Sequence, residues 1–398
     1  MSDPVVIVSV ARTPIGAMMG ELSGLAGNQL GSVAIKAAVE RAGLKPEQVQ
    51  EVIMGCVLPA GQGQAPARQA TLGAGLPLST VATTINKVCG SGMKAAMMAH
   101  DQLLAGSVDV IVAGGMESMS NAPYLLPKAR GGYRYGHATT FDHMALDGLE
   151  DAYEKTPNGG GKSMGNYAEE TASKYGFTRE AQDAFAIEST RRALAANTDG
   201  SFDWEIAPVT VSGRGGEVQI SKDESPYKAK PEKIPTLKPA FKKDGTVTAA
   251  TSSSISDGAA ALVLMRASTA DKLGLKPIAR IVGHATHAHD PAWFTTAPVG
   301  AIEKLYAKTG WNTESVDLFE INEAFAVVTM AAMHDHKLPH EQVNVNGGAC
   351  ALGHPIGASG ARVIVTLIGA LKKRGLKRGV ASLCIGGGEA TAMAVELF

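Results

Sequence analysis

Short apolar segments alternate with helical patterns along the first part of the chain. Four segments have the length and apolar character of buried strands: 5–10, 52–57, 81–86 and 108–113. Three segments between them carry apolar residues at helical spacing: 28–42, 67–74 and 92–104. Strands that alternate with helices favour a largely parallel sheet with helices on both faces. The pattern therefore predicts an α/β fold.

The same alternation returns near the end of the chain. Strands are predicted at 279–282, 318–321, 343–345 and 380–385, and helices at 301–308, 323–333 and 360–371. Between the two alternating regions the pattern fails, and 221–243 is dense in Lys and Pro. A helix is predicted there at 178–196, with Thr178 as its N-cap. We expect an inserted, loop-rich region of the kind that binds a ligand over a rigid scaffold.

Glycine-containing stretches near the two ends of the chain resemble each other. Residues 89–92 (CGSG) precede a predicted helix, a strand and then GGME at 114–117. Residues 358–360 (ASG) likewise precede a helix, a strand and GGE at 387–389. This similarity predicts an internal duplication. The division is an N-terminal half at 1–119, an inserted loop domain at 120–249 and a C-terminal half at 250–398.

Composition and charge exclude several classes of protein. Hydrophobic residues make up 45% and charged residues 19% of the 398 positions, which suits a packed globular protein and excludes a mainly disordered one. The 37 Lys and Arg nearly balance the 38 Asp and Glu, so no charge excess favours nucleic acid or an anionic membrane. The apolar runs are too short to span a bilayer. Because neither end resembles a targeting signal, we expect a cytoplasmic location.

The four cysteines suit neither a disulfide framework nor a zinc site. Cys56, Cys89, Cys350 and Cys384 are far apart, and no two of them form a Cys-x-x-Cys pair. The histidines at 334, 336 and 340 lie at a polar helix end that we interpret as a solvated surface. We therefore expect no metal site.

Cys89 and His354 each lie in a glycine-rich turn before a predicted helix. The free N–H groups and the positive end of a helix favour a thiolate at Cys89, although a small buried thiol is the alternative. His354 has an ordinary pKa of about 6.5, which suits proton transfer near neutral pH. The alternative for His354 is a histidine that only hydrogen-bonds a turn.

Cys384 and Asn322 both follow predicted strands. In an open α/β sheet, the carboxyl ends of the strands form the ligand crevice. Cys384 precedes three glycines there, although it can equally be a small core residue. Asn322 can orient a water or an oxyanion, or it can cap the next helix.

Taken together, these residues carry a resemblance to one family. Four blocks occur in order at the family's spacing: 89–92 (CGSG), 322–325 (NEAF), 353–357 (GHPIG) and 384–388 (CIGGG). Residues 10–16 and 256–260 are also similar to that family. Over essentially its whole length the chain resembles a thiolase, and most closely the acetyl-CoA acetyltransferases. The resemblance implies two βαβαβαββ halves in layered α-β-α-β-α packing, with an inserted loop domain.

The resemblance also implies a ping-pong Claisen condensation of two acetyl-CoA to acetoacetyl-CoA and CoA, and the reverse thiolysis. Cys89 would carry the acetyl group, and His354 would accept its proton. His354, with a water held by Asn322, would stabilise one thioester oxyanion. Cys384 would remove the α-proton of the second acetyl-CoA. The backbone N–H groups of Cys89 and Gly386 would form the second oxyanion hole.

Coenzyme A and acetyl-CoA would be substrates, with no tightly bound cofactor. The resemblance places Ser253 and Leu237 against the pantetheine arm, and Met164 and Phe325 around the acyl group. The arginine that often follows the acidic pair at 223–224 is missing, so we expect Lys228 or a neighbour to meet the adenosine end. Members of the family are usually dimers or tetramers, so a homotetramer built as a dimer of dimers is expected.

Other functions stay open at this point. Many members specific for acetoacetyl-CoA have a histidine where this chain has Ser163, which leaves a degradative 3-ketoacyl-CoA thiolase for longer chains as an alternative. A decarboxylating ketoacyl synthase would use two histidines, and Cys384 argues against it. A scaffold or CoA-binding protein without activity predicts a substituted catalytic position, whereas all four are intact.

Overall fold

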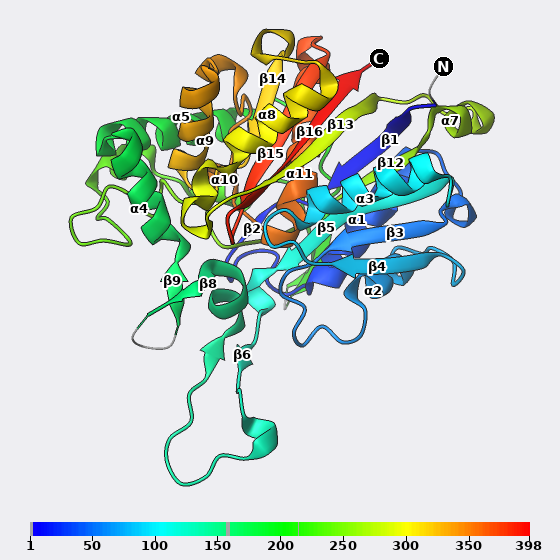
Figure 1. The fold of residues 1–398 in the computed structure, drawn as a ribbon. Helices are drawn as coiled ribbons and strands as arrows, with labels where there is room; N and C mark the ends of the chain where they lie inside the picture. The colour runs from blue at the N-terminus through cyan, green and yellow to red at the C-terminus, as the bar shows by residue number, and fades with distance from the viewer. Residues whose placement is uncertain (1–2, 157–159, 214) are drawn as a thin grey trace.

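A mixed ten-stranded sheet dominates the structure, a computed structural model that describes residues 3–156, 160–213 and 215–398 (Figure 1). Its strands run in the order β4-β3-β5-β12-β1-β13-β16-β15-β14, with β2 paired to β12. Their bounds are β1 Val5–Arg12, β2 Gly16–Ala17, β3 Glu51–Gly55, β4 Val81–Ile85, β5 Val110–Ser118, β12 Ser256–Arg266, β13 Ala279–Ala288, β14 Leu318–Ile321, β15 Arg378–Ile385 and β16 Glu389–Leu397.

Two similar runs of elements make up this sheet and its helices. The first is β1-α1-β3-α2-β4-α3-β5-β12, and the second is β13-α8-β14-α9-α11-β15-β16. The helices are α1 Gly27–Arg41, α2 Pro66–Gly73, α3 Ser91–Ala105, α8 Ala297–Thr309, α9 Ala326–His336 and α11 Ile356–Arg374. Each run ends in two antiparallel strands, β5 with β12 and β15 with β16. This topology is the duplication that the glycine-containing stretches predict.

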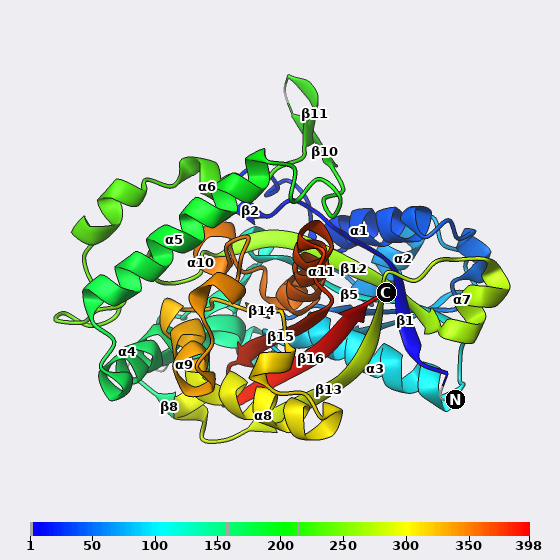
Figure 2. The same cartoon turned by 90° about the horizontal axis from the view of Figure 1, so that it is seen from above.

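Helices α3 and α11 form a central layer between the two parts of the sheet. They pack on each other, on β5 and β12 of the first run, and on strands of the second run. Helices α1 and α2 cover the outer face of the first part. Helix α8 covers β13 and β16 on the side away from α11 (Figure 2). The predicted α-β-α-β-α layering is confirmed.

Glycines allow the two central helices to approach closely. A Cβ added at Gly360 would lie 2.3 Å from the backbone nitrogen of Met93, and one at Gly92 would lie 2.7 Å from that of Ala361. Real Cβ atoms do not approach backbone so closely, so only glycine fits at either position. The abundance of glycine in the sequence therefore has a packing role in the central layer.

Two expectations about the sheet are corrected by the structure, and two strands are added to it. It is mixed rather than largely parallel, because β12 and β16 return antiparallel beside their neighbours. These two apolar strands were not predicted. The predicted strand at 343–345 is wrong: Val343 forms a single bridge to Phe319, and Asn344 has φ +48°. A left-handed residue interrupts the extended backbone that a strand requires.

The region between β5 and β12 contains the remaining shorter elements. Those described are β6 Tyr124–Leu125, β7 Phe141–Asp142, β8 Glu150–Lys155, β9 Gly161–Ser163, α4 Met164–Tyr175, α5 Arg179–Thr198, β10 Val209–Gly213, β11 Gly216–Ile220 and α6 Glu224–Lys228. The predicted helix at 178–196 is α5, and the Thr178 side chain accepts a hydrogen bond from the Ala181 N–H at its start. Two short helices lie elsewhere in the chain: α7 Ala267–Leu273 and α10 Ala349–Leu352.

A buried ion cluster ties this inserted region to the first strand. Arg12 of β1 pairs with Glu205 at 2.5 Å and with Asp223 at 2.6 Å, and all three side chains are fully buried. Arg12 also donates through Nη2 to the second oxygen of Asp223 at 3.0 Å. Loss of one partner from such a cluster would leave an uncompensated buried charge.

The division at 119/120 and 249/250 stays a prediction. Strand β12 begins beyond residue 250, yet it pairs with β1 and β5 of the first run. In the described ranges, no helix combines the length and the apolarity needed to cross a membrane.

Candidate active site

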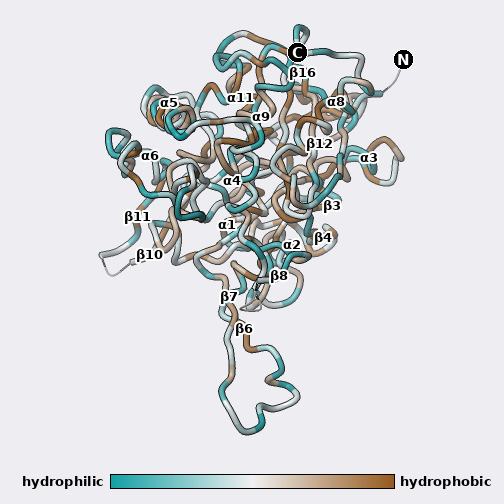
Figure 3. Tube along the Cα trace, turned by 60° about the vertical axis from the view of Figure 1, so that its left-hand side comes forward, coloured by the Kyte–Doolittle hydropathy of each residue, from teal (hydrophilic) through white to brown (hydrophobic). Residues whose placement is uncertain are grey.

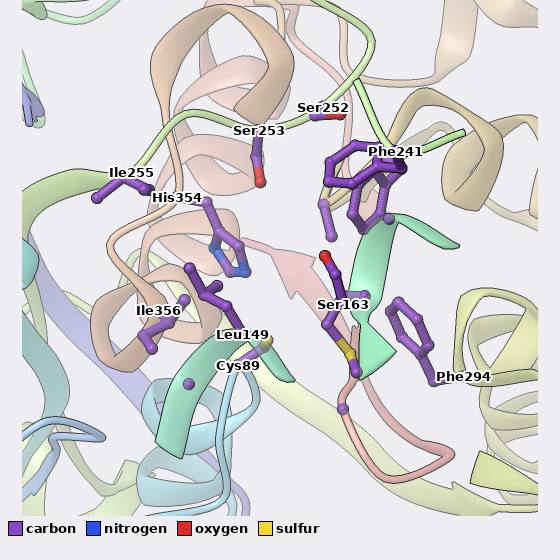
Figure 4. Close-up of a pocket in the computed structure, with 16 residues that line it drawn as sticks. Cys89, Leu149, Ser163, Phe241, Ser252, Ser253, Ile255, Phe294, His354 and Ile356 are labelled. Atoms are coloured by element: carbon purple, nitrogen blue, oxygen red, sulfur yellow. The ribbon is translucent and has the colours of Figure 1, made fainter. Parts of the chain in front are cut away.

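Three turns from distant parts of the chain meet at one cavity of about 230 Å³. Cys89 comes from the turn between β4 and α3, His354 from the turn before α11, and Gly386 from the turn after β15. Figure 4 shows the His354 ring and the Cys89 sulfur facing the same hollow. The sequence predicted all three as site residues, and the structure brings them together.

The turn that carries Cys89 is fixed by local hydrogen bonds. The Asn86 side chain accepts from the Val88 N–H at 2.8 Å, and the Ser91 hydroxyl accepts from the Lys87 N–H at 2.8 Å. Val88 has φ +46°, a conformation that is strained for a β-branched residue. Strain of this kind is typical of functional turns that the surrounding structure holds in place.

Burial decides the protonation state of Cys89. It raises the pKa of the thiol to about 11, although the N–H groups of Gly386 and of Cys89 itself lower it. The N–H groups act in the predicted direction, but burial outweighs them, so the thiol stays protonated in the unliganded protein. Two N–H groups do not offset the loss of water around the sulfur.

His354 is held as a neutral base. Its Nδ1 lies 2.6 Å from the Ser359 hydroxyl, and that hydroxyl donates its own proton to the Pro355 carbonyl at 3.0 Å. The hydroxyl must therefore accept from Nδ1–H, which leaves Nε2 with a free lone pair. Nε2 is buried and has no hydrogen-bond partner among the described residues. Burial, and then the positive charge of Arg362, lower the pKa of His354 to about 3.

Asn322 lies behind His354 rather than on the cavity wall. Its Nδ2 is 3.5 Å from His354 Nδ1, and its Oδ1 accepts from Nη2 of Arg362 at 3.3 Å. It follows the short buried strand β14 directly. The structure thus places Asn322 next to His354, as the sequence predicted.

Cys384 is fully buried near the end of β15, two residues before Gly386. Burial raises the pKa of its thiol, and the nearby Cys89 sulfur raises it further. Cys384 does not itself line the cavity, but Gly386, two residues further on, lines it together with Cys89. A thiolate formed at Cys384 would be a strong base, since its conjugate acid is weak.

Apolar side chains make up most of the cavity wall. Phe241 and Phe294 each pack edge-on against Phe325, with ring centroids 5.9 and 6.5 Å away. The other lining residues are Gly148, Leu149, Ser163, Met164, Gly165, Ser252, Ser253, Ile255, Ala324 and Ile356. The sequence-predicted Ser253, Met164 and Phe325 are therefore part of the cavity.

Leu237 and Lys228 lie elsewhere, on a second hollow of about 420 Å³. The backbone segment 252–255 connects the two hollows, because Ser253 lines the first and Ser254 the second. Lys228 is paired with the buried carboxylate of Glu224. Two further cations line this hollow, Lys230 and Lys233.

Several residues of the site were missed by sequence reasoning. Phe241 lies in an irregular segment and Phe294 in a short 3₁₀ helix at Pro291–Thr296, and no periodic pattern marks either one. Ser359 and Arg362 could have been found from the sequence, because they are polar residues in an apolar helical pattern. They lie on the apolar helix α11, and Arg362 is its one charged residue before the C-terminal turn. A charge inside an otherwise apolar helix demands a buried partner.

A cluster of possible metal ligands lies outside this site. His100 and Asp101 of α3 meet His284 of β13, with Asp101 Oδ1 3.0 and 2.9 Å from the two imidazoles. Three lysines line the adjoining hollow with His284: Lys94, Lys304 and Lys308. These positive charges disfavour a divalent cation, so we interpret the cluster as a hydrogen-bonded link between α3 and β13.

Comparison with known proteins gives a consistent result. The family model "Thiolase, N-terminal domain" matches residues 5–268, and "Thiolase, C-terminal domain" matches residues 275–397. Acetyl-CoA acetyltransferase 2 of Arabidopsis thaliana is 52% identical over 396 residues, covering 99% of this chain and 97% of the relative. The acetyl-CoA acetyltransferase of Cupriavidus necator is 50% identical over 398 residues, covering both chains completely.

Solved structures agree with these relatives. The acetyl-CoA acetyltransferase of Bacillus anthracis superposes with a TM-score of 0.96 at 42% identity, covering 100% of this chain and 99% of the other. The Acat5 thiolase of Ascaris suum, solved with coenzyme A, gives a TM-score of 0.92 at 43% identity. That match covers 99% of this chain and 100% of the other.

Proposed function

The chain belongs to the thiolase family, and we propose that the cavity at Cys89 carries out the acetyl transfer of an acetyl-CoA C-acetyltransferase. The protein is an acyltransferase whose substrates are CoA thioesters. The observation that carries the residue assignment is the free Nε2 lone pair of His354, which faces the same cavity as the Cys89 thiol.

The first half-reaction follows from this geometry. Nε2 of His354 takes the Cys89 proton as the sulfur attacks the thioester carbonyl. The N–H groups of Gly386 and Cys89 already point at this sulfur, so they are placed for the oxyanion that forms beside it. When the C–S bond to CoA breaks, His354 returns the proton to the departing CoA sulfur. Acetyl-Cys89 is the product.

The second half-reaction forms the new carbon–carbon bond. The Cys384 thiol gives its proton to Nε2 of His354, and the thiolate so formed takes an α-proton from the second acetyl-CoA and becomes a thiol again. The resulting enolate, held by the His354 imidazolium and a water on Asn322, attacks the acetyl carbonyl of acetyl-Cys89. The bond to Cys89 breaks, the imidazolium returns its proton to the Cys89 sulfur, and acetoacetyl-CoA leaves. Thiolysis is the reverse sequence.

Acetylation of the protein by acetyl-CoA tests this assignment. Intact mass should show one added acetyl group on wild-type protein and none on Cys89→Ala. Thiolysis of acetoacetyl-CoA should fall by about a hundredfold or more in the same variant. Cys56→Ala removes a buried thiol that does not line the cavity, and it should keep the acetyl group. Near-wild-type turnover of Cys89→Ala would refute the assignment.

The cavity supports a preference for short acyl groups, because three phenylalanines close around about 230 Å³. Ser163 on the same wall favours the second candidate, a degradative 3-ketoacyl-CoA thiolase for longer chains. Turnover of C4, C6 and C8 3-ketoacyl-CoA distinguishes the two. We expect kcat/KM to fall by about tenfold or more beyond C4. Equal or rising values would support the longer-chain function.

The second hollow is our candidate for the rest of coenzyme A. Leu237 would contact pantetheine, and Ser253 would meet it at the entrance to the cavity. Lys228 is occupied by Glu224, so Lys230 and Lys233 are the better placed cations for phosphate. Their charges attract anions without a specific geometry, as lysines do.

A homotetramer is part of the proposal. Strand β4 is an edge of the sheet with exposed Val81 and Thr83, and an open edge strand favours pairing with a second copy. The arm between β6 and β7 projects from the body in Figures 1 and 3 and exposes Tyr124 and Leu126. Exposed apolar surface of this kind is typical of subunit contacts.

Four free cysteines support a reducing compartment such as the cytoplasm.

A further inference from the structure

Arg362 is a buried cation in the centre of the molecule. Its side chain is 2% exposed, and it lies in a stretch of α11 whose residues from 356 to 371 are all buried. Nη1 donates to Glu320 Oε1 at 2.6 Å, and Nη2 donates to Asn322 Oδ1 at 3.3 Å. One guanidinium therefore joins a carboxylate of β14 to the amide beside His354.

This contact decides which end of the Asn322 amide faces the site. An arginine side chain only donates hydrogen bonds, so the amide oxygen must be the atom that faces it. The amide nitrogen is then turned toward His354, where it lies 3.5 Å from Nδ1. An oxyanion or the water that binds it requires donors. A rotated amide would present its oxygen instead and would repel the developing negative charge.

We propose that Arg362 is a positioning residue that, paired with Glu320, fixes Asn322 with its amide nitrogen toward the His354 imidazole. The inference rests on the proposed role of Asn322 in the thiolase reaction. Glu320 is needed because it compensates the buried charge. The planar fork of arginine reaches both partners at once, which a lysine ammonium does not do from one position.

The cation also acts on His354. Burial, and then Arg362, lower the pKa of His354, so the imidazole stays neutral and able to accept a proton. The groups that face this region from the packed elements include Arg362 of α11, Glu320 of β14 and Glu323 just after it, Glu205 of the inserted region, Glu117 of β5, Cys89 before α3 and Cys384 of β15. Burial raises the pKa of Glu320 itself to about 7. Removal of the cation raises the pKa of His354 and moves the acid limb of the pH profile to higher pH.

The variant Arg362→Lys tests the orientation of Asn322 separately from the positive charge near His354. It keeps a cation beside Glu320 and loses the fork to Asn322. We expect kcat to fall by roughly ten- to a hundredfold, as for a misplaced catalytic group, with little change in KM. The acid limb should stay where it is in the wild type, well below neutral pH, because the cation that lowers the pKa of His354 is kept.

The double variant Arg362→Gln/Glu320→Gln replaces the ion pair by a neutral pair of similar shape. It should lose kcat and also move the acid limb to higher pH, because His354 then binds a proton more readily. If Arg362 only stabilised the fold, both variants would be less stable, but the pH profile of the double variant would not differ from that of Arg362→Lys.

Arg374→Lys is the matched control. Arg374 lies on the same helix and donates to the side-chain oxygen of Asn346 at the same 3.3 Å, and neither residue lines the cavity. It should keep wild-type kcat and pH profile. Unchanged kcat in Arg362→Lys, or an equal loss in Arg374→Lys, would overturn the inference.

Two further measurements cover the case in which the Arg362 variants do not fold and the case in which the proposed function is wrong. If the Arg362 variants do not fold, Asn322→Asp keeps the contact with Arg362 and removes the donor. It should lose kcat to a similar degree, and wild-type kcat in that variant would overturn the inference. Failure of the proposed function can be told apart from failure of the Arg362 inference. If the proposed function is wrong, wild-type protein gains no acetyl group on Cys89.

Discussion

At the scale of single residues, the reaction centre is a neutral pair. The pKa of Cys89 is raised to about 11 and that of His354 is lowered to about 3, in both cases chiefly by burial. Both groups are therefore uncharged between about pH 4 and pH 10. The proton moves only when the sulfur attacks, so the unliganded protein holds no thiolate–imidazolium pair.

This pair gives Cys89 a characteristic reactivity. Because only the thiolate is alkylated, the rate of inactivation by iodoacetamide should rise about tenfold per pH unit from pH 6 to 9. The rise should continue beyond pH 9, whereas a free thiol with a pKa of about 8.5 reaches a plateau there. Residual thiolysis activity after timed treatment measures the rate, and acetyl-CoA should protect. A rate that is flat from pH 6 upward would show a preformed ion pair instead.

At the scale of elements, the site depends on the spacing of α3 and α11. Cys89 precedes the first helix, and His354 precedes the second. The glycines that let these helices approach therefore also set the separation of thiol and imidazole. Glu117 strengthens the same junction, since its buried carboxylate accepts N–H bonds from Val57, Leu58 and Gly357.

Gly360→Ala should separate the two central helices. The added Cβ would meet the Met93 nitrogen at 2.3 Å, so the backbone must move. We expect the free energy of unfolding to fall by about 1–3 kcal/mol or more, as in other overpacked cores, together with a loss of kcat. Urea unfolding and thiolysis measure the two effects.

A glycine with free space provides the comparison. At Gly24 the nearest atom to an added Cβ is Val211 Cγ1 at 3.9 Å, an ordinary contact. Gly24→Ala should change stability by less than about 0.5 kcal/mol. If Gly360→Ala behaves in the same way, the close packing of α3 and α11 does not limit stability.

At the scale of the whole molecule, the projecting arm contributes little to its own subunit. Tyr135 on this arm is fully exposed, and Tyr124 is 72% exposed. Aromatic side chains of this size are costly to leave in water, since each buries a large apolar area when it packs. A second copy of the chain is the partner that the proposed assembly supplies.

Replacement of residues 126–140 by a short Gly-Ser turn should therefore change the assembly and spare the catalytic centre. We expect a tetramer in wild-type protein and a dimer in the variant, measured by light scattering after size exclusion. Thiolysis activity per subunit should be retained. Val218→Ser, which alters an exposed residue away from the arm, should stay tetrameric. A tetramer without the arm would contradict its role in assembly.

The sequence by itself determined the repeated elements and the chemistry. Apolar runs and helical spacing are local patterns, so they located β1, α1, β3, α3 and β15 within a few residues. The four blocks around Cys89, Asn322, His354 and Cys384 were recognisable because glycine-rich turns before helices and after strands need particular residues. The thiolase fold and the acyltransferase activity followed from them.

Only the tertiary structure decided the remaining features. Strands β12 and β16 pair antiparallel with distant neighbours, and no local pattern specifies a partner. The protonation state of Cys89 depends on burial, and the orientation of Asn322 depends on Arg362, which lies 40 positions further along the chain. Burial and electrostatic interactions arise between groups that are close in space, and folding alone brings these groups together.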